Sequence, residues 1–383
     1  MNKRLLALAV VVVMAVSLFA GCAGGGGTIK IGAIQPISGK ISEYGTQSRD
    51  AINLAIKEIN AKGGVLGKKV EVFVEDDEAN PEKTVNAFNK LVTQQKVIGI
   101  IGALTSNSSL AINKLAQERK IVMISPSSTN AAVTEAGDYV FRASFIDPFQ
   151  GTVNAKFAFD NLKAKKAAVI FDNTNDYSKG LKDSFIAKFK ELGGEVTAEE
   201  SYSSTDKDFA AQLTKIKGTN PEILFIPDYY NMVALIAKQA RNQGITATFL
   251  GGDGWEAIAQ NAGDEVVGSY YSNHYSSGAN DPEVKAFVAA FQAEYKLPAD
   301  KKPNALAALA YDATYILLEA IQRAGSTDTS KIKVEMAKTD RKFVTGKIKY
   351  NEKRDAVKSA VMIKVDKGAD GKLTEVFDSI VNP

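Results

Sequence analysis

The stretch VIGIIGALTSNSS, residues 97–109, sets the pattern of this chain: an unbroken apolar run is followed by a polar turn where a helix begins. A short apolar run without alternation is typical of a strand that is buried on both faces of a parallel sheet. Ile121–Ile124 repeats the pattern and leads into a second Ser/Thr-rich turn, residues 125–129. We expect both runs to be parallel strands with their polar turns in the crevice at the carboxyl edge of the sheet.

Strand-like and helix-like segments alternate outward from this stretch, starting at Thr28. Asn80-Pro81-Glu82 has the features of a helix start: a capping side chain, a proline in the first turn and an acid at the positive end of the dipole. Further strands are expected at 29–34, 70–74, 167–171 and 223–226, and further helices at 52–59, 178–192 and 231–244. This alternation predicts an α/β fold with right-handed βαβ units in two doubly wound sheets, hence two lobes with a cleft between them.

Composition limits the functions that are open to the chain. Its 383 residues suffice for two domains, and 45% hydrophobic content with mixed charge fits a globular α/β protein. The net charge of +3 gives no argument for nucleic acid. Cys22 and His274 are the only cysteine and histidine, which disfavours triads and histidine metal clusters. We therefore expect no enzyme, cofactor or metal, although Asp, Glu, Lys and Tyr can also perform acid–base chemistry.

The N-terminus has the organisation of an export signal. Lys3 and Arg4 precede an uncharged run, Leu5–Phe19, and then Ala20-Gly21-Cys22. We predict a lipoprotein signal peptide at 1–21, acylation of Cys22 and a flexible linker at 22–28, which places the protein outside the cytoplasm on a lipid anchor. Phe19 stands where a lipobox usually has leucine, so an ordinary signal or a retained anchor with an incidental cysteine remains the alternative.

From Ile29 to about Asp378 the chain resembles the amino-acid-binding proteins of ABC importers, of the leucine/isoleucine/valine-binding type. The features that carry the resemblance, in order, are residues 39–45, 58–64, 76–81, 124–129, 141–151 and 239–244. The resemblance implies the type I periplasmic binding protein fold with a three-segment hinge. It places an N-terminal lobe at 29–147 plus 276–352, a C-terminal lobe at 148–275 plus 353–383, and crossings near Asp147, His274 and 351–355.

The family binds an α-amino acid between its lobes, and the resemblance assigns its contacts. Ser106 and Thr129 would hold the α-carboxylate, while the carbonyl of Ser127 and the side chain of Asp253 would hold the α-ammonium. Glu is common where this chain has Asp253, so the shorter arm is expected to draw the ligand deeper or to leave a bridging water. Judged from the residues alone, the serines and threonines are equally compatible with helix caps and turns.

The resemblance also assigns the walls of the pocket. Tyr44, Tyr177 and Tyr229 would enclose the ligand, although core or surface positions remain the simpler alternative for tyrosine. Trp255 and Leu306 are expected near the side-chain end of the ligand. His274 is expected to be a structural hinge residue and not a ligand or a pH switch. Tyr230 and Asn130 could add polarity that the aliphatic-specific proteins lack.

The expected function is that of a lipid-anchored, extracytoplasmic solute-binding protein. It would capture a branched-chain or other hydrophobic α-amino acid and deliver it to the permease and ATPase of an ABC transporter. It is expected to be a monomer that meets the membrane only through its lipid. The alternatives are an amino-acid or amide sensor feeding a signalling system, and a hydrolase or transferase, for which no catalytic constellation is visible.

Overall fold

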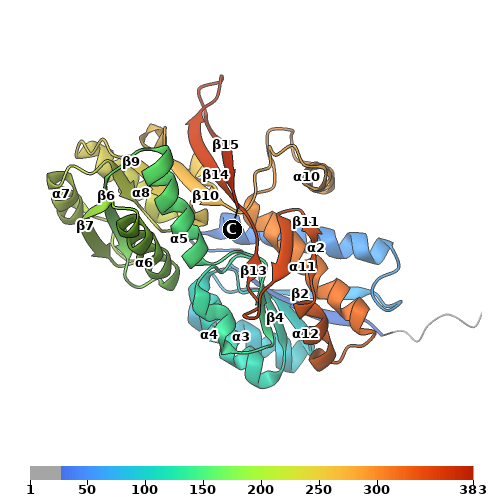
Figure 1. Ribbon diagram of the computed structural model, residues 1–383. Helices are drawn as coiled ribbons and strands as arrows, with labels where there is room; N and C mark the ends of the chain where they lie inside the picture. Colours follow the sequence, from blue (N-terminus) through green and yellow to red (C-terminus); the bar gives the residue numbers. More distant parts are fainter. Residues whose placement is uncertain (1–26, 383) are drawn as a thin grey trace, which may run out of the picture.

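The computed structural model describes residues 27–382, so the predicted signal peptide and Cys22 lie outside the described residues. Two α/β lobes lie side by side (Figure 1). In the part of the chain that is described, no helix is both long and apolar enough to cross a membrane.

The N-terminal lobe contains a five-stranded parallel sheet in the order β2-β1-β3-β4-β5. Helices α2 and α11 pack on one face with the larger core, and α3 and α4 pack on the other. The elements are β1 (Ile29–Gln35), α2 (Ser42–Ala61), β2 (Val70–Asp76), α3 (Pro81–Lys90), β3 (Gly99–Ile101), α4 (Ser106–Arg119), β4 (Val122–Ser125), β5 (Val140–Arg142), α10 (Pro282–Tyr295), α11 (Ala305–Ala324), α12 (Thr329–Ala337), and the small antiparallel sheet β11 (Asp340–Phe343), β12 (Gly346–Tyr350) and β13 (Ala356–Val357).

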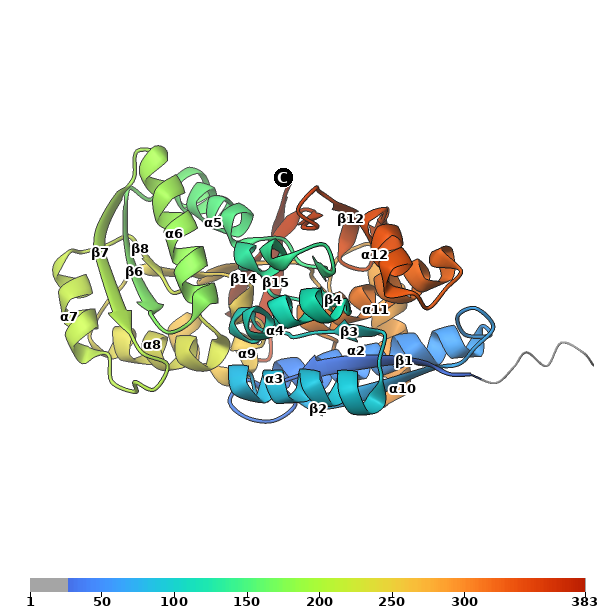
Figure 2. The ribbon, with the colours of Figure 1, turned by 90° about the horizontal axis from the view of Figure 1, so that it is seen from below.

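The C-terminal lobe contains a seven-stranded sheet in the order β15-β14-β10-β9-β8-β6-β7, in which β14 runs antiparallel to both of its neighbours, β10 and β15, and the other pairs are parallel. Figure 2 shows α5 and α6 on one face and α7 and α8 on the other. The elements are α5 (Asp147–Lys156), β6 (Lys166–Asp172), α6 (Asp176–Glu191), β7 (Glu195–Tyr202), α7 (Ala210–Gly218), β8 (Ile223–Phe225), α8 (Tyr230–Asn242), β9 (Thr248–Gly251), α9 (Ile258–Asn261), β10 (Tyr270–Asn273), β14 (Ala360–Lys367) and β15 (Leu373–Val381).

Local signals in the sequence match the elements that form. Asn80 caps α3, since its side-chain oxygen accepts hydrogen bonds from the backbone N–H groups of Glu82 and Lys83 at 2.9 and 3.1 Å. The predicted strand at 97–101 begins later, at Gly99, because the Val97 N–H still bonds the Leu91 carbonyl of the preceding helical turn.

The chain passes between the sheets three times, before α5, after β10 and before β14. The segments that lead into the first and third passages are joined by a buried ion pair, in which Arg142 Nε lies 2.8 Å from Asp355 Oδ1. Ala356 packs in the core of the N-terminal lobe and β13 pairs with β12, so strand pairing favours a third crossing after Val357. The exact residue limits of the two lobes remain a proposal.

Candidate ligand-binding site

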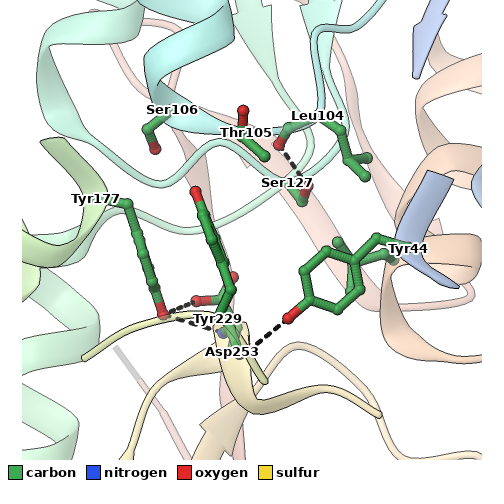
Figure 3. A pocket seen from close by; sticks show the side chains of 10 residues that line it. Tyr44, Leu104, Thr105, Ser106, Ser127, Tyr177, Tyr229 and Asp253 are labelled. Carbon is green, nitrogen blue, oxygen red and sulfur yellow. Dashed lines mark hydrogen bonds between the residues drawn. The ribbon is translucent and has the colours of Figure 1, made fainter. Parts of the chain in front are cut away.

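A cavity of about 20 Å³, room for about one water molecule, lies between the carboxyl edges of the two sheets (Figure 3). On the N-terminal side it adjoins the point where the strand order reverses between β1 and β3, the usual ligand position in doubly wound sheets. All predicted site residues except Thr129 and Trp255 line it. The full lining is Tyr44, Leu104, Thr105, Ser106, Ser127, Tyr177, Tyr229, Asp253, Gly254 and Leu306.

Ser106 is placed to meet an anion. It is the first residue of α4, a 14-residue helix whose N-terminal N–H groups and dipole favour negative charge. Its hydroxyl oxygen accepts from the Asn130 N–H at 3.3 Å, which leaves the hydroxyl proton free to donate. Thr129 does not line the cavity, but it is 1% exposed and its hydroxyl has no partner among the described residues.

Ser127 joins the two polar turns. Its hydroxyl donates to the Leu104 carbonyl at 2.8 Å (Figure 3), so the turn after β4 is fixed against the turn after β3. Within residues 27–382, no donor is found for the Ser127 carbonyl oxygen. That oxygen therefore remains able to accept from an ammonium group.

Asp253 presents a buried carboxylate that is held by neutral donors. Its Oδ1 accepts from the Tyr177 hydroxyl at 2.9 Å and from the Gln150 amide at 3.0 Å, and its Oδ2 lies 3.0 Å from His274 Nε2. The Tyr177 hydroxyl has no proton left for a ligand, because it donates its single proton to Asp253. It also accepts from the Gly254 N–H at 3.0 Å. The Tyr177 ring, not its hydroxyl, is what a ligand would meet.

Sequence reasoning missed Gln150 and His274 as partners of Asp253. Gln150 lies 103 residues away along the chain and His274 lies 21 away. No local sequence pattern predicts either contact, because each contact depends on how α5 and β10 pack against the turn that carries Asp253. The only available signal was that both residues fall in segments predicted to lie near lobe crossings.

Glycines surround Asp253 because the packing leaves no room for side chains. A Cβ on Gly252 would lie 2.7 Å from the Tyr177 hydroxyl oxygen, and one on Gly254 would lie 2.7 Å from the Asp228 carbonyl. A Cβ on Gly251 would lie 1.9 Å from the indole nitrogen of Trp255. The Gly-Gly-Asp-Gly motif thus serves close packing around the acid.

Three tyrosines form the apolar walls. Tyr177 and Tyr229 stack with ring centroids 5.3 Å apart, and Tyr44 meets Tyr229 edge-on at 6.1 Å. Burial raises the pKa of each hydroxyl well above its ordinary value, so the rings stay neutral. Tyr44 donates its proton to the Gly254 carbonyl at 2.5 Å, a hydrogen bond that runs from one lobe to the other. The cavity is therefore polar at its head and apolar along its sides.

Three residues expected near the ligand have other partners. Trp255 is fully buried beneath the site, where its indole donates to the Ile226 carbonyl at 2.8 Å. It supports the cavity floor and does not line the cavity. Tyr230 donates to the Lys40 carbonyl and Asn130 donates to the Asp176 carbonyl, both across the lobe boundary.

Two buried acids flank the site. Burial raises the pKa of Asp147 to about 8, and the charge of Asp253 adds to this shift. Burial likewise raises the pKa of Asp228 to about 7. Asp228 and Tyr229 help to line a second cavity of about 440 Å³ between the lobes, which shares Thr105 and Tyr229 with the first. Over residues 27–382, no group of acids, histidines or cysteines is arranged to hold a metal ion.

Comparison with known proteins gives consistent matches. The family model described as periplasmic binding protein matches residues 28–371. A Leu/Ile/Val-binding protein homolog of Brucella abortus is 33% identical over 94% of this chain and 96% of that protein.

Solved structures match the fold over almost the whole chain. The leucine-binding protein LivK of Thermotoga maritima is 40% identical with a TM-score of 0.86, covering 93% of this chain and 99% of that one. LivJ of Streptococcus pneumoniae, solved with isoleucine, is 34% identical with a TM-score of 0.83, covering 92% and 100%. A solute-binding protein of Rhodopseudomonas palustris, solved with 3,4-dihydroxybenzoic acid, is 27% identical with a TM-score of 0.82, covering 93% and 97%.

Proposed function

This chain belongs to the periplasmic binding protein family, and from that premise we propose that it captures a branched-chain or other hydrophobic α-amino acid between its lobes and delivers it to an ABC permease. The family comprises extracytoplasmic solute-binding proteins, not enzymes. The proposal includes a lipid anchor on Cys22.

One observation carries the proposal: a single cavity brings a helix N-terminus and a buried carboxylate together with aromatic and aliphatic walls. The α4 terminus with Ser106 is suited to an anionic group, and Asp253 is suited to a cationic one. A ligand that carries an ammonium group and a carboxylate on the same carbon atom satisfies both features. An α-amino acid is such a ligand.

Different residues are proposed to bind the carboxylate, the ammonium group and the side chain of the ligand. Ser106 and the Thr129 hydroxyl would donate to the α-carboxylate, and the Ser127 carbonyl and Asp253 would accept from the α-ammonium. Hydrogen bonds of this charge-assisted kind contribute about 1.5–3 kcal/mol each. Tyr44 and Leu306 would pack against an aliphatic side chain, whose burial adds about 0.8 kcal/mol per methylene.

An aromatic carboxylate is the competing ligand, because the Rhodopseudomonas palustris neighbour was solved with one. Such a ligand would satisfy Ser106 but would leave the Asp253 charge facing an uncharged ring. A buried charge without a partner is costly. The carboxylate of Asp253 therefore favours the amino acid.

A ligand screen tests the proposal. Thermal unfolding would be followed with each of the twenty amino acids and with benzoate and 3,4-dihydroxybenzoate. We expect leucine, isoleucine or valine to stabilise the protein, by about 2.7 kcal/mol at a hundredfold excess over Kd. Asp253→Ala should abolish this stabilisation while the unliganded protein remains folded. Stabilisation by the benzoates alone would contradict the proposal.

Anchoring and delivery need separate measurements. Cys22→Ser should move the protein from the membrane fraction to the soluble fraction after export. Deleting the gene should reduce uptake of radiolabelled ligand in cells that keep the permease. Unchanged uptake with intact binding would favour a sensing role.

A further inference from the structure

His274 joins the hinge to the binding site. It follows β10 directly, where the chain leaves the C-terminal lobe, and its ring stacks on Phe145 with centroids 3.7 Å apart. Phe145 lies just before α5, on another passage between the lobes. The Nε2 edge of the imidazole reaches the site, with Nε2 at 3.0 Å from Asp253 Oδ2.

Building on the proposed function, we propose that His274 is a positioning residue for ammonium recognition: its neutral imidazole donates Nε2–H to Asp253 and fixes the carboxylate so that one lone pair faces the ligand. This role differs from that of a structural hinge residue, which the sequence suggested.

The identity of the donor follows from the chemistry of the pair. An ionised carboxylate only accepts, so the proton of a neutral imidazole that bonds it must be on Nε2. The other ring nitrogen, Nδ1, is buried and has no hydrogen-bond partner among the described residues. A buried polar atom without a partner destabilises the fold. An apolar ring could fill the same space without that cost, if packing were the only role of this side chain. The Nε2–H donor, in contrast, requires the histidine.

The hydrogen bonds on Asp253 leave one acceptor site unfilled, and this site is on Oδ2, the oxygen that His274 contacts. Each carboxylate oxygen has about two acceptor sites. Oδ1 is filled by Tyr177 and Gln150, whereas Oδ2 has only His274. A ligand ammonium therefore shares Oδ2 with the imidazole.

Burial keeps the histidine neutral, so it does not neutralise the charge of the acid. The pKa of His274 is lowered to about 4, mainly because the ring is buried; the hydrogen bond and charge of Asp253 oppose this shift, and the charge of Lys358 adds to it. Across residues 27–382, His274 is the only basic side chain within salt-bridge distance of Asp253. The negative charge of Asp253 is thus held by neutral donors and stays available to a cation. Asp147 adds a second acid in this region, and its raised pKa keeps it largely protonated at neutral pH.

The inference can be tested without any substitution, because His274 is the only histidine in the chain. In tag-free protein labelled with ¹⁵N-histidine, imidazole NMR reports this one ring. We expect the neutral Nε2–H tautomer at pH 5.5 to 8, with its signals shifting on saturation with L-leucine. An Nδ1–H tautomer, titration near the ordinary pKa of about 6.5 or no shift with leucine would overturn the inference.

Two substitutions add a functional readout. His274→Gln retains a donor near Nε2, and His274→Met retains volume only. Calorimetry would use L-leucine and 4-methylpentanoate, which lacks the ammonium. For His274→Met we expect about 10- to 100-fold weaker leucine binding and less than about threefold change for 4-methylpentanoate. His274→Gln should stay within about threefold of the wild type for both probes.

The two failures are distinguishable. Equal losses for both probes, or full leucine affinity in His274→Met, would overturn the positioning role while the proposed function stands. A wild-type protein that binds no hydrophobic α-amino acid would overturn the proposed function, and this inference with it.

Discussion

Removing one oxygen atom from Tyr44 should weaken ligand binding without weakening either lobe. The Tyr44 hydroxyl belongs to the N-terminal lobe and donates to the Gly254 carbonyl of the C-terminal lobe. Tyr44→Phe deletes this hydrogen bond, together with the long one that the hydroxyl accepts from the Tyr230 N–H at 3.5 Å, and retains the ring contacts with Tyr229 and Tyr230. In an open conformation the Gly254 carbonyl would bond water instead. The substitution therefore disfavours the closed, ligand-binding conformation alone.

The size of the effect follows from burial. Both partners are buried, so in the closed form the substitution leaves a buried carbonyl without a donor, which costs about 1–3 kcal/mol. The hydroxyl is neutral, because burial raises its pKa, so no charge term is added. Since closure and binding are linked, we expect Kd to rise by about 5- to 150-fold.

Calorimetry with the ligand found by the screen measures this change, and Tyr295→Phe is the matched control. Tyr295 donates to the Asp50 carbonyl at 2.7 Å within the N-terminal lobe, so its loss should lower stability by about 1 kcal/mol and leave Kd unchanged. A Tyr44→Phe protein whose Kd stays within twofold of the wild type would refute the reasoning. So would an equal loss of affinity in the control.

Other contacts give further predictions. Asn107 accepts from the Asp176 N–H at 2.7 Å across the lobes, so Asn107→Ala should weaken binding about 3- to 10-fold and raise the radius of gyration measured by small-angle scattering; an unchanged Kd would show that this hydrogen bond does not favour the closed conformation. Asp355→Ala leaves Arg142 buried without its partner and should lower the free energy of unfolding by about 3–5 kcal/mol in urea titrations; a loss below 1 kcal/mol would contradict this. Asp147 has a folded pKa of about 8 against about 3.9 unfolded, so the native state binds more protons between these values and stability falls as pH rises through that window. Asp147→Asn should remove the part of this decrease in stability that Asp147 causes. Curves of unfolding free energy against pH that run parallel for the variant and the wild type would contradict this prediction.

The parts of the fold that local chemistry determines were predictable. Apolar runs located β3 and β4, the Asn80 cap located α3, and the polar turns after the two strands met at one edge as expected. That meeting follows from parallel pairing alone, because parallel strands bring their carboxyl ends together.

Contacts that depend on packing between distant elements were not predictable. The antiparallel hairpin of β14 and β15 and the small sheet of β11 to β13 carry no signal that separates them from the parallel strands. Whether Trp255 faces the ligand or the core depends on the 3-10 turn Asp253–Trp255 after β9, in which successive side chains point about 120° apart. The sequence reports residue types in order, whereas these outcomes depend on which surfaces meet.

The crowding around Gly251, Gly252 and Gly254 tells a protein engineer where this scaffold tolerates redesign. Adding even one methyl group there would displace Tyr177 or Trp255 and disturb the carboxylate at the centre of the site. Leu104 and Leu306, by contrast, line the cavity from outside that cluster. A biosensor library for new analytes should therefore keep residues 251–254 constant and diversify those two positions.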